Sequence, residues 1–197
     1  MKAVLLYFGS FNPVHKGHIA VAEWVLAQGV CNELWFVVSP QNPLKTDGSL
    51  IGATDRLAMV ELAIDVSKYP HRMKTCDVEF SMPRPSYTID TLRELSVRYP
   101  DVEFSILVGS DIVGQIEYWK EWHTLLKNYK VYVYPRRGYE MPDRDDKRFI
   151  QLLGAPLEDY SSTEVRQALE ENGNSDMIPD VVKKYIKNTG LWKTVMK

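Results

Sequence analysis

The sequence is poor in cysteine, carries almost no net charge and lacks a long apolar run. Its 197 residues include two cysteines, Cys31 and Cys76, which form neither a CxxC pattern nor metal-ligand spacing. This argues against a disulfide framework or a cysteine metal site and indicates reduced thiols in a cytosolic protein. The formal net charge of -2 argues against a general nucleic-acid binder, which needs a basic face.

No apolar run approaches the roughly 18 residues of a membrane span, and no signal-peptide apolar core follows Met1. We therefore expect a cytoplasmic protein with neither a membrane nor a nucleic-acid partner. Hydrophobic residues make up 45% of the chain and charged residues 25%, as in ordinary globular proteins. A chain of this length can bury a sizeable core, so we expect a single domain over residues 1–197.

Strand-like and helix-like patterns alternate along the chain. The strand-like runs are rich in Val, Ile, Phe and Tyr, and several are apolar throughout, which is typical of a parallel sheet covered on both faces. The expected strands are Ala3–Phe8, Leu34–Val38, Thr75–Phe80, Phe104–Val108 and Val131–Tyr134, and the expected helices are Gly17–Gln28, Thr54–Val66, Thr88–Tyr99 and Pro179–Lys187. This order predicts an α/β fold, a doubly wound Rossmann-like parallel sheet, with a small helical C-terminal part over about residues 161–197.

The segment Gly9–His18, Gly-Ser-Phe-Asn-Pro-Val-His-Lys-Gly-His, is the most informative one, and it directly follows the first expected strand. A tight turn leads into a helix whose first turn carries His15 and His18 on one side. Imidazoles beside a helix N-terminus can hold phosphate oxygens where negative charge builds up in nucleotidyl transfer. The structural alternative is that one histidine caps the helix while the other packs, and the turn's position behind a buried strand makes it less favoured.

A second anion-binding segment is Ser161-Ser162-Thr163-Glu164-Val165-Arg166, which has the spacing of a capping box. The helix N-terminus that the cap organises attracts anions, and Arg166 adds a bidentate phosphate donor. Gly109-Ser110-Asp111 follows another expected strand, so it should point at the same crevice as Gly9–His18. These segments together predict a nucleotide site.

Several strings resemble a known family. Gly9-x-Phe11-x-Pro13-x-His15-x-Gly17-His18 resembles the signature of the nucleotidyltransferase superfamily with the (T/H)xGH motif, and Ser161–Arg166 resembles the superfamily's ATP-phosphate element. Ser86–Leu92 resembles the SYTxDTL string of nicotinate-nucleotide adenylyltransferases, and Gly190-Leu191-Trp192 resembles that family's G-L-Y ending. The resemblance covers roughly residues 3 to 192.

The resemblance implies adenylyl transfer from ATP to nicotinate mononucleotide, giving nicotinate adenine dinucleotide and pyrophosphate in NAD synthesis, with Mg²⁺ bound largely through substrate and water. It implies the catalytic residues His15, His18 and Arg166 and the ATP-binding residues Gly9, Ser10, Phe11, His15, His18, Gly109, Asp111, Ser161, Ser162, Thr163 and Arg166. It implies the acceptor-binding residues Lys45, Tyr87, Thr88, Trp119 and Arg136, and no metal ligand from the protein. The expected partners are the two small-molecule substrates, and a homo-oligomer stays open.

Some residues around the acceptor also have simpler readings. Thr88 fits the N-cap of a helix, and Asp90 fits its dipole. Trp119 and Trp122 resemble the family's W-x-x-W pair, whose first Trp stacks on the pyridine ring, and for Trp122 we expect core packing. Pro135-Arg136-Arg137-Gly138 resembles an R-P-G element in which Arg137 replaces Pro, so the sequence leaves open which Arg reaches the phosphates.

Three other functions stay open. Asn12 stands where many bacterial members have Asp, and the same S-F-N-P string occurs in eukaryote-type nicotinamide/nicotinate mononucleotide adenylyltransferases, so an enzyme with dual specificity or a nicotinamide mononucleotide preference is one alternative. An adenylyl- or cytidylyltransferase for another phosphate acceptor, such as phosphopantetheine, is a second, which Tyr87, Thr88 and Trp119 disfavour. A non-catalytic nucleotide sensor is the third.

Overall fold

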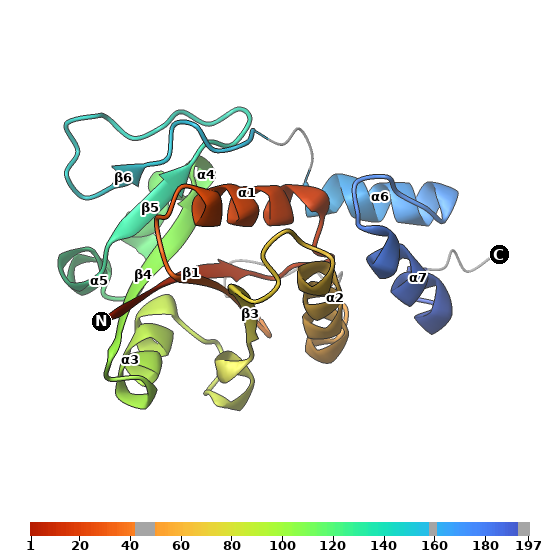
Figure 1. The fold of residues 1–197 in the computed structure, drawn as a ribbon, viewed down its shortest axis with the longest axis horizontal. Helices are drawn as coiled ribbons and strands as arrows, with labels where there is room; N and C mark the ends of the chain where they lie inside the picture. The colour runs from red at the N-terminus through yellow and green to blue at the C-terminus, as the bar shows by residue number, and fades with distance from the viewer. Residues whose placement is uncertain (42–49, 158–160, 193–197) are drawn as a thin grey trace.

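The computed structural model of the chain describes residues 1–41, 50–157 and 161–192. Its centre is a six-stranded sheet with the strand order β3-β2-β1-β4-β5-β6 (Figure 1), and each neighbouring pair is parallel. The strands are β1 Lys2–Gly9, β2 Glu33–Val38, β3 Met73–Cys76, β4 Val102–Gly109, β5 Val131–Tyr134 and β6 Ile150–Gln151. The predicted doubly wound α/β fold is confirmed, and the strand order reverses between β1 and β4.

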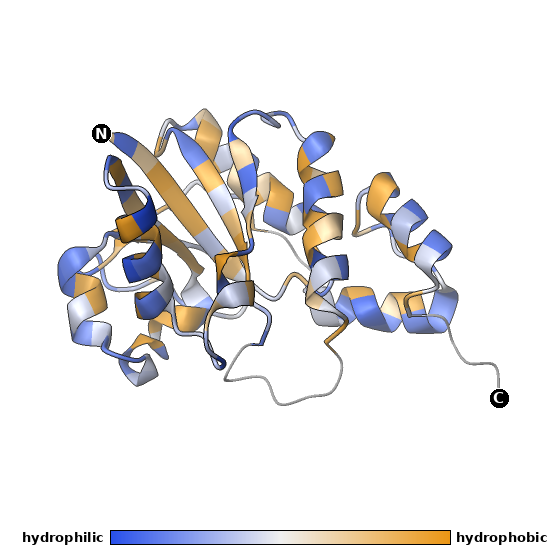
Figure 2. Ribbon diagram, turned by 90° about the horizontal axis from the view of Figure 1, so that it is seen from below, coloured by the Kyte–Doolittle hydropathy of each residue, from blue (hydrophilic) through white to orange (hydrophobic). Residues whose placement is uncertain are grey.

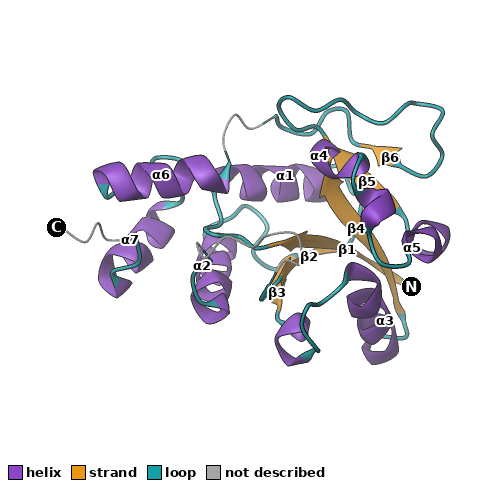
Figure 3. Ribbon diagram, turned by 180° about the vertical axis from the view of Figure 1, so that it is seen from behind, coloured by secondary structure: helices purple, strands orange, loops and turns teal. Residues whose placement is uncertain are grey.

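Helices cover both faces of the sheet, because the central strands are apolar on both sides. On β1, Leu5 and Tyr7 join the apolar cluster under one set of helices, whereas Val4 and Leu6 join the cluster on the opposite face. The first set is α1 Lys16–Ala27, α2 Ala53–Asp65, α6 Ser162–Asn172 and α7 Asp180–Thr189, and the second contains α3 Thr88–Arg98 and α5 Trp122–Asn128. Figure 2 shows the central strands largely hydrophobic, and Figure 3 shows α6 and α7 next to α1 and α2, away from α3 and α5.

The fold differs from the sequence prediction at one strand. The expected strand Thr75–Phe80 is wrong in its second half, since β3 ends at Cys76 and a 3-10 turn, η1 Val78–Ser81, follows. The Phe80 N–H donates to the Asp77 carbonyl at 2.8 Å, which closes that turn. The alternation of Val78, Glu79 and Phe80 imitates a half-buried strand, but Glu79 is only 2% exposed and has polar partners inside the protein.

The sequence analysis did not predict four short elements. They are α4 Ser110–Val113, η2 Ile116–Tyr118, α5 Trp122–Asn128 and the two-residue strand β6 Ile150–Gln151. The expected helical C-terminal part contains α6 and α7. Within the described ranges, no helix combines the length and the apolar composition that a bilayer crossing requires.

Candidate active site

The carboxyl ends of β1 and β4 lie side by side, because these two strands pair directly in the sheet. The segment Gly9–His18 leaves β1, and Gly109–Asp111 leaves β4 into α4. The end of β2 joins them, since the Ser39 N–H donates to the Gly9 carbonyl at 2.9 Å. The structure thus brings together the two segments that the sequence assigns to one crevice, at the place where α/β sheets bind ligands.

The turn after β1 has a fixed shape. Phe11 adopts a left-handed backbone with φ of 44°, and the Asn12–Pro13 peptide bond is cis. The Phe11 ring is 2% exposed and packs edge to face against Tyr7. A Cβ on Gly9 would lie 2.8 Å from Phe11 Cζ, so this position requires glycine. Gly9 and Phe11, both predicted to bind ATP, therefore shape the loop through contacts inside the protein.

His15 and His18 cap the first turn of α1 for each other. The His18 backbone N–H donates to His15 Nδ1 at 3.4 Å, and the His15 backbone N–H donates to His18 Nδ1 at 3.1 Å. A ring nitrogen that accepts a hydrogen bond carries no proton, so in each neutral ring the hydrogen is on Nε2. In this arrangement Nε2–H is the donor of each ring, and Nδ1 accepts from the backbone of the helix. The capping role and the predicted phosphate role are therefore compatible.

Electrostatics keep His15 neutral. The side chain is 2% exposed, and its ring stacks on that of His18 with centroids 3.6 Å apart. Burial, together with the positive charge of Arg136, lowers the pKa of His15 to about 3. At neutral pH His15 is thus a hydrogen-bond donor rather than a cation.

A narrow cleft opens beside the two histidines. Its lining residues come from β1, the start of α1, β5, and the segments after β5 and β6. They are Tyr7, His15, Gly17, His18, Val21, Tyr134, Pro135, Arg136 and Pro156. Its volume of about 10 Å³ is close to the minimum that holds one water molecule. Binding a phosphate group there requires the cleft to widen.

Arg136 is the cation of this cleft, and it is held from several sides. Its backbone N–H donates to Ser110 Oγ at 2.9 Å, and its Nε lies 3.8 Å from Asp111 Oδ1. Burial raises the pKa of the Tyr134 hydroxyl, and the positive charge of Arg136 opposes that rise. A Cβ on Gly109 would lie 2.6 Å from Arg136 Cγ, so Gly109 makes room for this side chain. Arg137, the alternative phosphate contact, is exposed and does not line the cleft.

The C-terminal motif packs onto the turn after β1. Ser161 caps α6 in a capping box with Glu164, as the sequence predicts. Ser162 Oγ donates to the Pro13 carbonyl at 3.0 Å, and Arg166 Nη1 donates to the Asn12 carbonyl at 3.0 Å. Arg166 Nη2 also donates to Thr163 Oγ1 at 3.3 Å. The two predicted phosphate segments are thus in direct contact, although they lie at opposite ends of the sequence.

Arg56 is a buried charge that sequence reasoning missed. It is 0% exposed and donates to four backbone carbonyls, those of Ser10 at 2.6 Å, Ser39 at 2.7 Å, Ile51 at 3.0 Å and Pro40 at 3.1 Å. Burial lowers its pKa to about 10, so it stays charged at neutral pH. Arg56 therefore ties the ends of β1 and β2 to the start of α2. Its helical spacing with the buried Met59, Val60 and Ala63 was the available signal.

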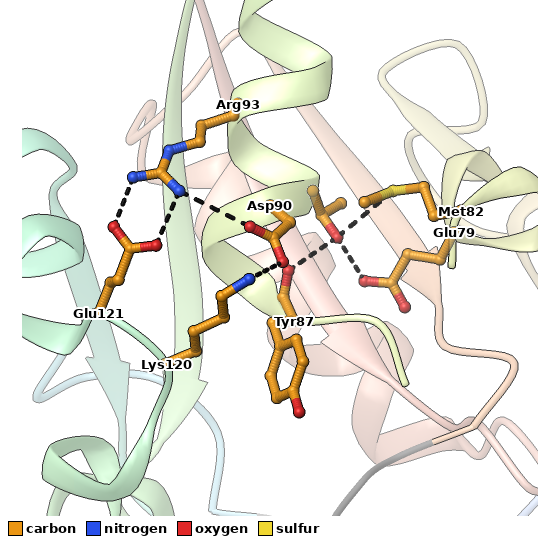
Figure 4. A network of polar contacts seen from close by, with 8 residues as sticks. Glu79, Met82, Tyr87, Asp90, Arg93, Lys120 and Glu121 are labelled. Atoms are coloured by element: carbon orange, nitrogen blue, oxygen red, sulfur yellow. Dashed lines mark hydrogen bonds and ion pairs between the residues drawn. The ribbon is translucent and has the colours of Figure 1, made fainter. Parts of the chain in front are cut away.

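The predicted acceptor residues lie at the start of α3 and near η2. The N-cap is Tyr87 rather than the predicted Thr88, which is the first residue of the helix, and no side chain caps this end. Lys120 Nζ lies 2.7 Å from Asp90 Oδ2 and 5.1 Å from the centroid of the Tyr87 ring (Figure 4). Arg93 donates to both carboxylate oxygens of Glu121, at 2.9 and 2.6 Å. These ion pairs tie the Tyr87 turn to the segment after Trp119.

The two tryptophans have different surroundings. Trp119 is half-buried and packs against the apolar cluster under α3 and α5. Trp122, for which core packing was expected, instead stacks its ring on His123 with centroids 3.4 Å apart. Trp119 remains the candidate for contact with a pyridine ring.

Glu79 is a second buried charge that the sequence did not reveal. Its Oε2 accepts from Ser86 Oγ at 2.7 Å, and its Oε1 accepts from Thr91 Oγ1 at 2.8 Å. Thr91 Oγ1 also donates to the Tyr87 carbonyl at 3.2 Å. The carboxylate therefore holds the acceptor turn from both of its ends.

Lys45, predicted to contact a phosphate, lies outside the described residues. Among the residues that the structure describes, no three His, Cys, Asp or Glu side chains gather where they could hold a metal ion.

The fold and the paired phosphate motifs define a nucleotidyltransferase. A family model described as cytidylyltransferase-like matches residues 6–168. A curated relative from Flavobacterium psychrophilum, named probable nicotinate-nucleotide adenylyltransferase, is 36% identical over 95% of this chain and 97% of its own. One from Bacteroides thetaiotaomicron with the same name is 39% identical over 84% of this chain and 81% of its own. The chain therefore belongs to the nicotinate-nucleotide adenylyltransferase family.

A solved structure has the same fold. The nicotinic acid mononucleotide adenylyltransferase of Plasmodium falciparum, complexed with NaAD, aligns with a TM-score of 0.86 at 22% identity and with full coverage of both chains. The same protein complexed with APC aligns with a TM-score of 0.85.

Proposed function

We propose that this protein transfers the adenylyl group of ATP to nicotinate mononucleotide, releasing pyrophosphate and forming nicotinate adenine dinucleotide. The observation that carries this proposal is the contact between the two phosphate segments, in which Ser162 and Arg166 bind the turn that leads to His15 and His18. The names of the relatives agree with it.

The reaction requires positioning and charge stabilisation rather than a general base. The 5′-phosphate of the mononucleotide is already a nucleophile at neutral pH and attacks the α-phosphorus of ATP in line. In this proposal the Nε2–H groups of His15 and His18 donate to the α- and β-phosphate oxygens, and Arg136 supplies positive charge. Ser162, Thr163 and Arg166 hold the departing pyrophosphate. Arg166 has several N–H donors, so it can bind the pyrophosphate while Nη1 donates to the Asn12 carbonyl.

The family uses ATP, and we propose Mg²⁺ as its divalent metal. The polar side chains of the cleft are imidazoles, hydroxyls and a guanidinium, which suit phosphate oxygens rather than Mg²⁺. The ion would therefore reach the site on the phosphates and water, where it would neutralise phosphate charge. We also propose a single domain over residues 1–197, working in the cytoplasm with small-molecule substrates and without nucleic acid or membrane, and open to homo-oligomer formation.

For the acceptor, we propose that the Tyr87–Thr88 turn at the N-terminus of α3 receives the nicotinate carboxylate while Trp119 stacks on the pyridine ring. Glu79 and the ion pairs of Lys120 and Arg93 hold this turn in place.

A competition assay tests the acceptor. Nicotinate mononucleotide, nicotinamide mononucleotide and phosphopantetheine are offered together with ATP, and the adenylylated products are quantified. Nicotinate adenine dinucleotide should dominate, and Trp119→Ala should raise the KM for the mononucleotide while Tyr118→Ala, at a side chain 84% exposed, should not. A dominant nicotinamide product would favour the alternative that Asn12 suggests, and a dominant pantetheine product would overturn the acceptor assignment.

A further inference from the structure

Lys120 connects the two parts of the candidate acceptor site. It directly follows Trp119 in the sequence, and its side chain reaches the first turn of α3, as Figure 4 shows. Its Nζ lies 2.7 Å from Asp90 Oδ2 and 5.1 Å from the centroid of the Tyr87 ring. The side chains of Lys120 and Asp90 are 43% and 31% exposed, so water screens their charges only in part.

Negative charge gathers around this turn. Asp90 lies in the first turn of α3, and the buried carboxylate of Glu79 accepts from two hydroxyls, which are neutral donors. Arg93 lies 3.6 Å from Asp90 Oδ1, but its guanidinium donates two hydrogen bonds to Glu121, which carries the opposite charge. The charges of Arg93 and Glu121 offset each other, so the charge of Asp90 is offset mainly by Lys120.

The charge at this turn matters for the choice of acceptor. Nicotinate and nicotinamide mononucleotide have the same ring and phosphate, but one has a carboxylate on the ring where the other has a neutral carboxamide. The two groups have nearly the same shape, so stacking on Trp119 distinguishes them poorly. The backbone N–H groups at the start of α3, which no side chain caps, can donate to an oxygen of either group. A unit charge nearby, in contrast, acts far more strongly on the carboxylate than on the carboxamide.

We propose that Lys120 is a specificity-determining residue, which favours nicotinate over nicotinamide mononucleotide by offsetting the negative charge of Asp90 at the acceptor turn. This inference rests on the proposed function, because it takes the pyridine ring to lie between Trp119 and the Tyr87–Thr88 turn. Lys120 acts through its charge, so it requires no direct contact with the acceptor. Without Lys120, the Asp90 carboxylate repels the carboxylate of nicotinate mononucleotide and leaves binding of the carboxamide almost unchanged.

The test measures kcat/KM for each mononucleotide at saturating ATP and compares the nicotinate-to-nicotinamide ratio between variants. Lys120→Met keeps an unbranched apolar chain and should lower this ratio about 3- to 10-fold, as expected for one partly screened unit charge. Lys120→Arg keeps the charge and should leave the ratio within about twofold of wild type.

Removing the opposite charge should have the opposite effect. Asp90→Asn leaves the charge of Lys120 without its closest carboxylate, so the nicotinate-to-nicotinamide ratio should rise. The double variant Lys120→Met with Asp90→Asn removes both charges and should return to near the wild-type ratio. A loss of shape at the turn would not give two opposite shifts that cancel, so this result separates an electrostatic role from a structural one.

Lys130→Met is the matched control. It removes a cation that lies 2.8 Å from Glu103 Oε1, at the amino ends of β4 and β5, whereas the cleft lies at the carboxyl ends of the strands. This variant should leave the nicotinate-to-nicotinamide ratio unchanged.

An unchanged ratio in Lys120→Met, or a double variant shifted as far as Lys120→Met alone, would overturn the proposal. Each ratio is compared with that of the wild type, so the shift is informative whichever acceptor the wild type prefers. If Lys120→Met does not fold, Asp90→Asn carries the same test with the opposite sign, and an unchanged ratio there overturns the proposal. Wild-type protein that adenylylates neither mononucleotide overturns the proposed function instead, so the two failures are distinguishable.

Discussion

Lowering the pH should destabilise this protein through His15 in particular. In the folded state the pKa of His15 is about 3, whereas an unfolded chain has a histidine pKa of about 6.5. Above pH 6.5 both states are neutral at this residue and its contribution is complete. Between pH 6.5 and 3 the unfolded state binds the proton more readily, so stability is lost as the pH falls.

The size of the effect follows from these two values. Going from pH 8 to pH 5, the unfolded state gains about 2 kcal/mol from protonation at this residue, whereas the folded state gains almost nothing. His15→Asn removes the titrating ring and keeps an N-cap side chain that can accept from the His18 N–H. Urea unfolding of both proteins at pH 8 and pH 5 gives the loss of unfolding free energy over this interval for each protein. The loss in the wild type minus the loss in the variant is the contribution of His15, because the other titrating groups are common to both.

The wild type should lose about 2 kcal/mol more than His15→Asn over this pH interval. His71→Asn, at an exposed histidine, is measured beside it as the matched control. Parallel losses in the wild type and His15→Asn would refute the account of His15 as a buried, neutral cap.

Three further substitutions test other parts of the site. Arg56→Met leaves four carbonyls without their donor and should cost about 3 kcal/mol or more, lowering the melting temperature by about 6–12 °C, and a shift below about 2 °C would contradict its role. Glu79→Ala removes the carboxylate that accepts from the buried Ser86 and Thr91 hydroxyls and should raise the KM for nicotinate mononucleotide severalfold but not that for ATP, whereas equal changes would point to general disorder. Gly109→Ala should displace Arg136 and lower kcat/KM for ATP, while Gly114→Ala, with no atom within 4 Å of an added Cβ, should not, and equal activity of the two variants would count against Arg136.

The layout of the sheet and the segments at its switch point could be predicted from the sequence. The strands β1, β2, β4 and β5 are apolar on both sides, so their runs are continuous and the pattern is unambiguous. The strand-then-turn-then-helix order around Gly9–His18 and the capping box at Ser161 are local signals, and local signals survive in a single sequence.

Features that depend on contacts between distant segments could not be predicted. The carbonyls that surround Arg56 come from three places in the chain, and its charge argues against burial until those partners are known. The hydroxyls that bind Glu79 belong to Ser86 and Thr91, which lie beyond the end of η1. Without these partners in view, the pattern of Val78, Glu79 and Phe80 is that of a strand with one exposed face. Tyr7 and Tyr134 meet across β4, and neither strand's own pattern reveals that contact.

The reaction itself is the most direct test of the account. Wild-type protein and a folded His18→Ala variant are each incubated with ATP, Mg²⁺ and nicotinate mononucleotide, and both products are quantified over time. We expect nicotinate adenine dinucleotide and pyrophosphate in equal amounts from the wild type, and turnover lower by orders of magnitude in the variant, because it lacks an Nε2–H donor at the phosphates. Near wild-type turnover in the His18→Ala variant, or no dinucleotide from wild-type protein that binds ATP, would contradict it.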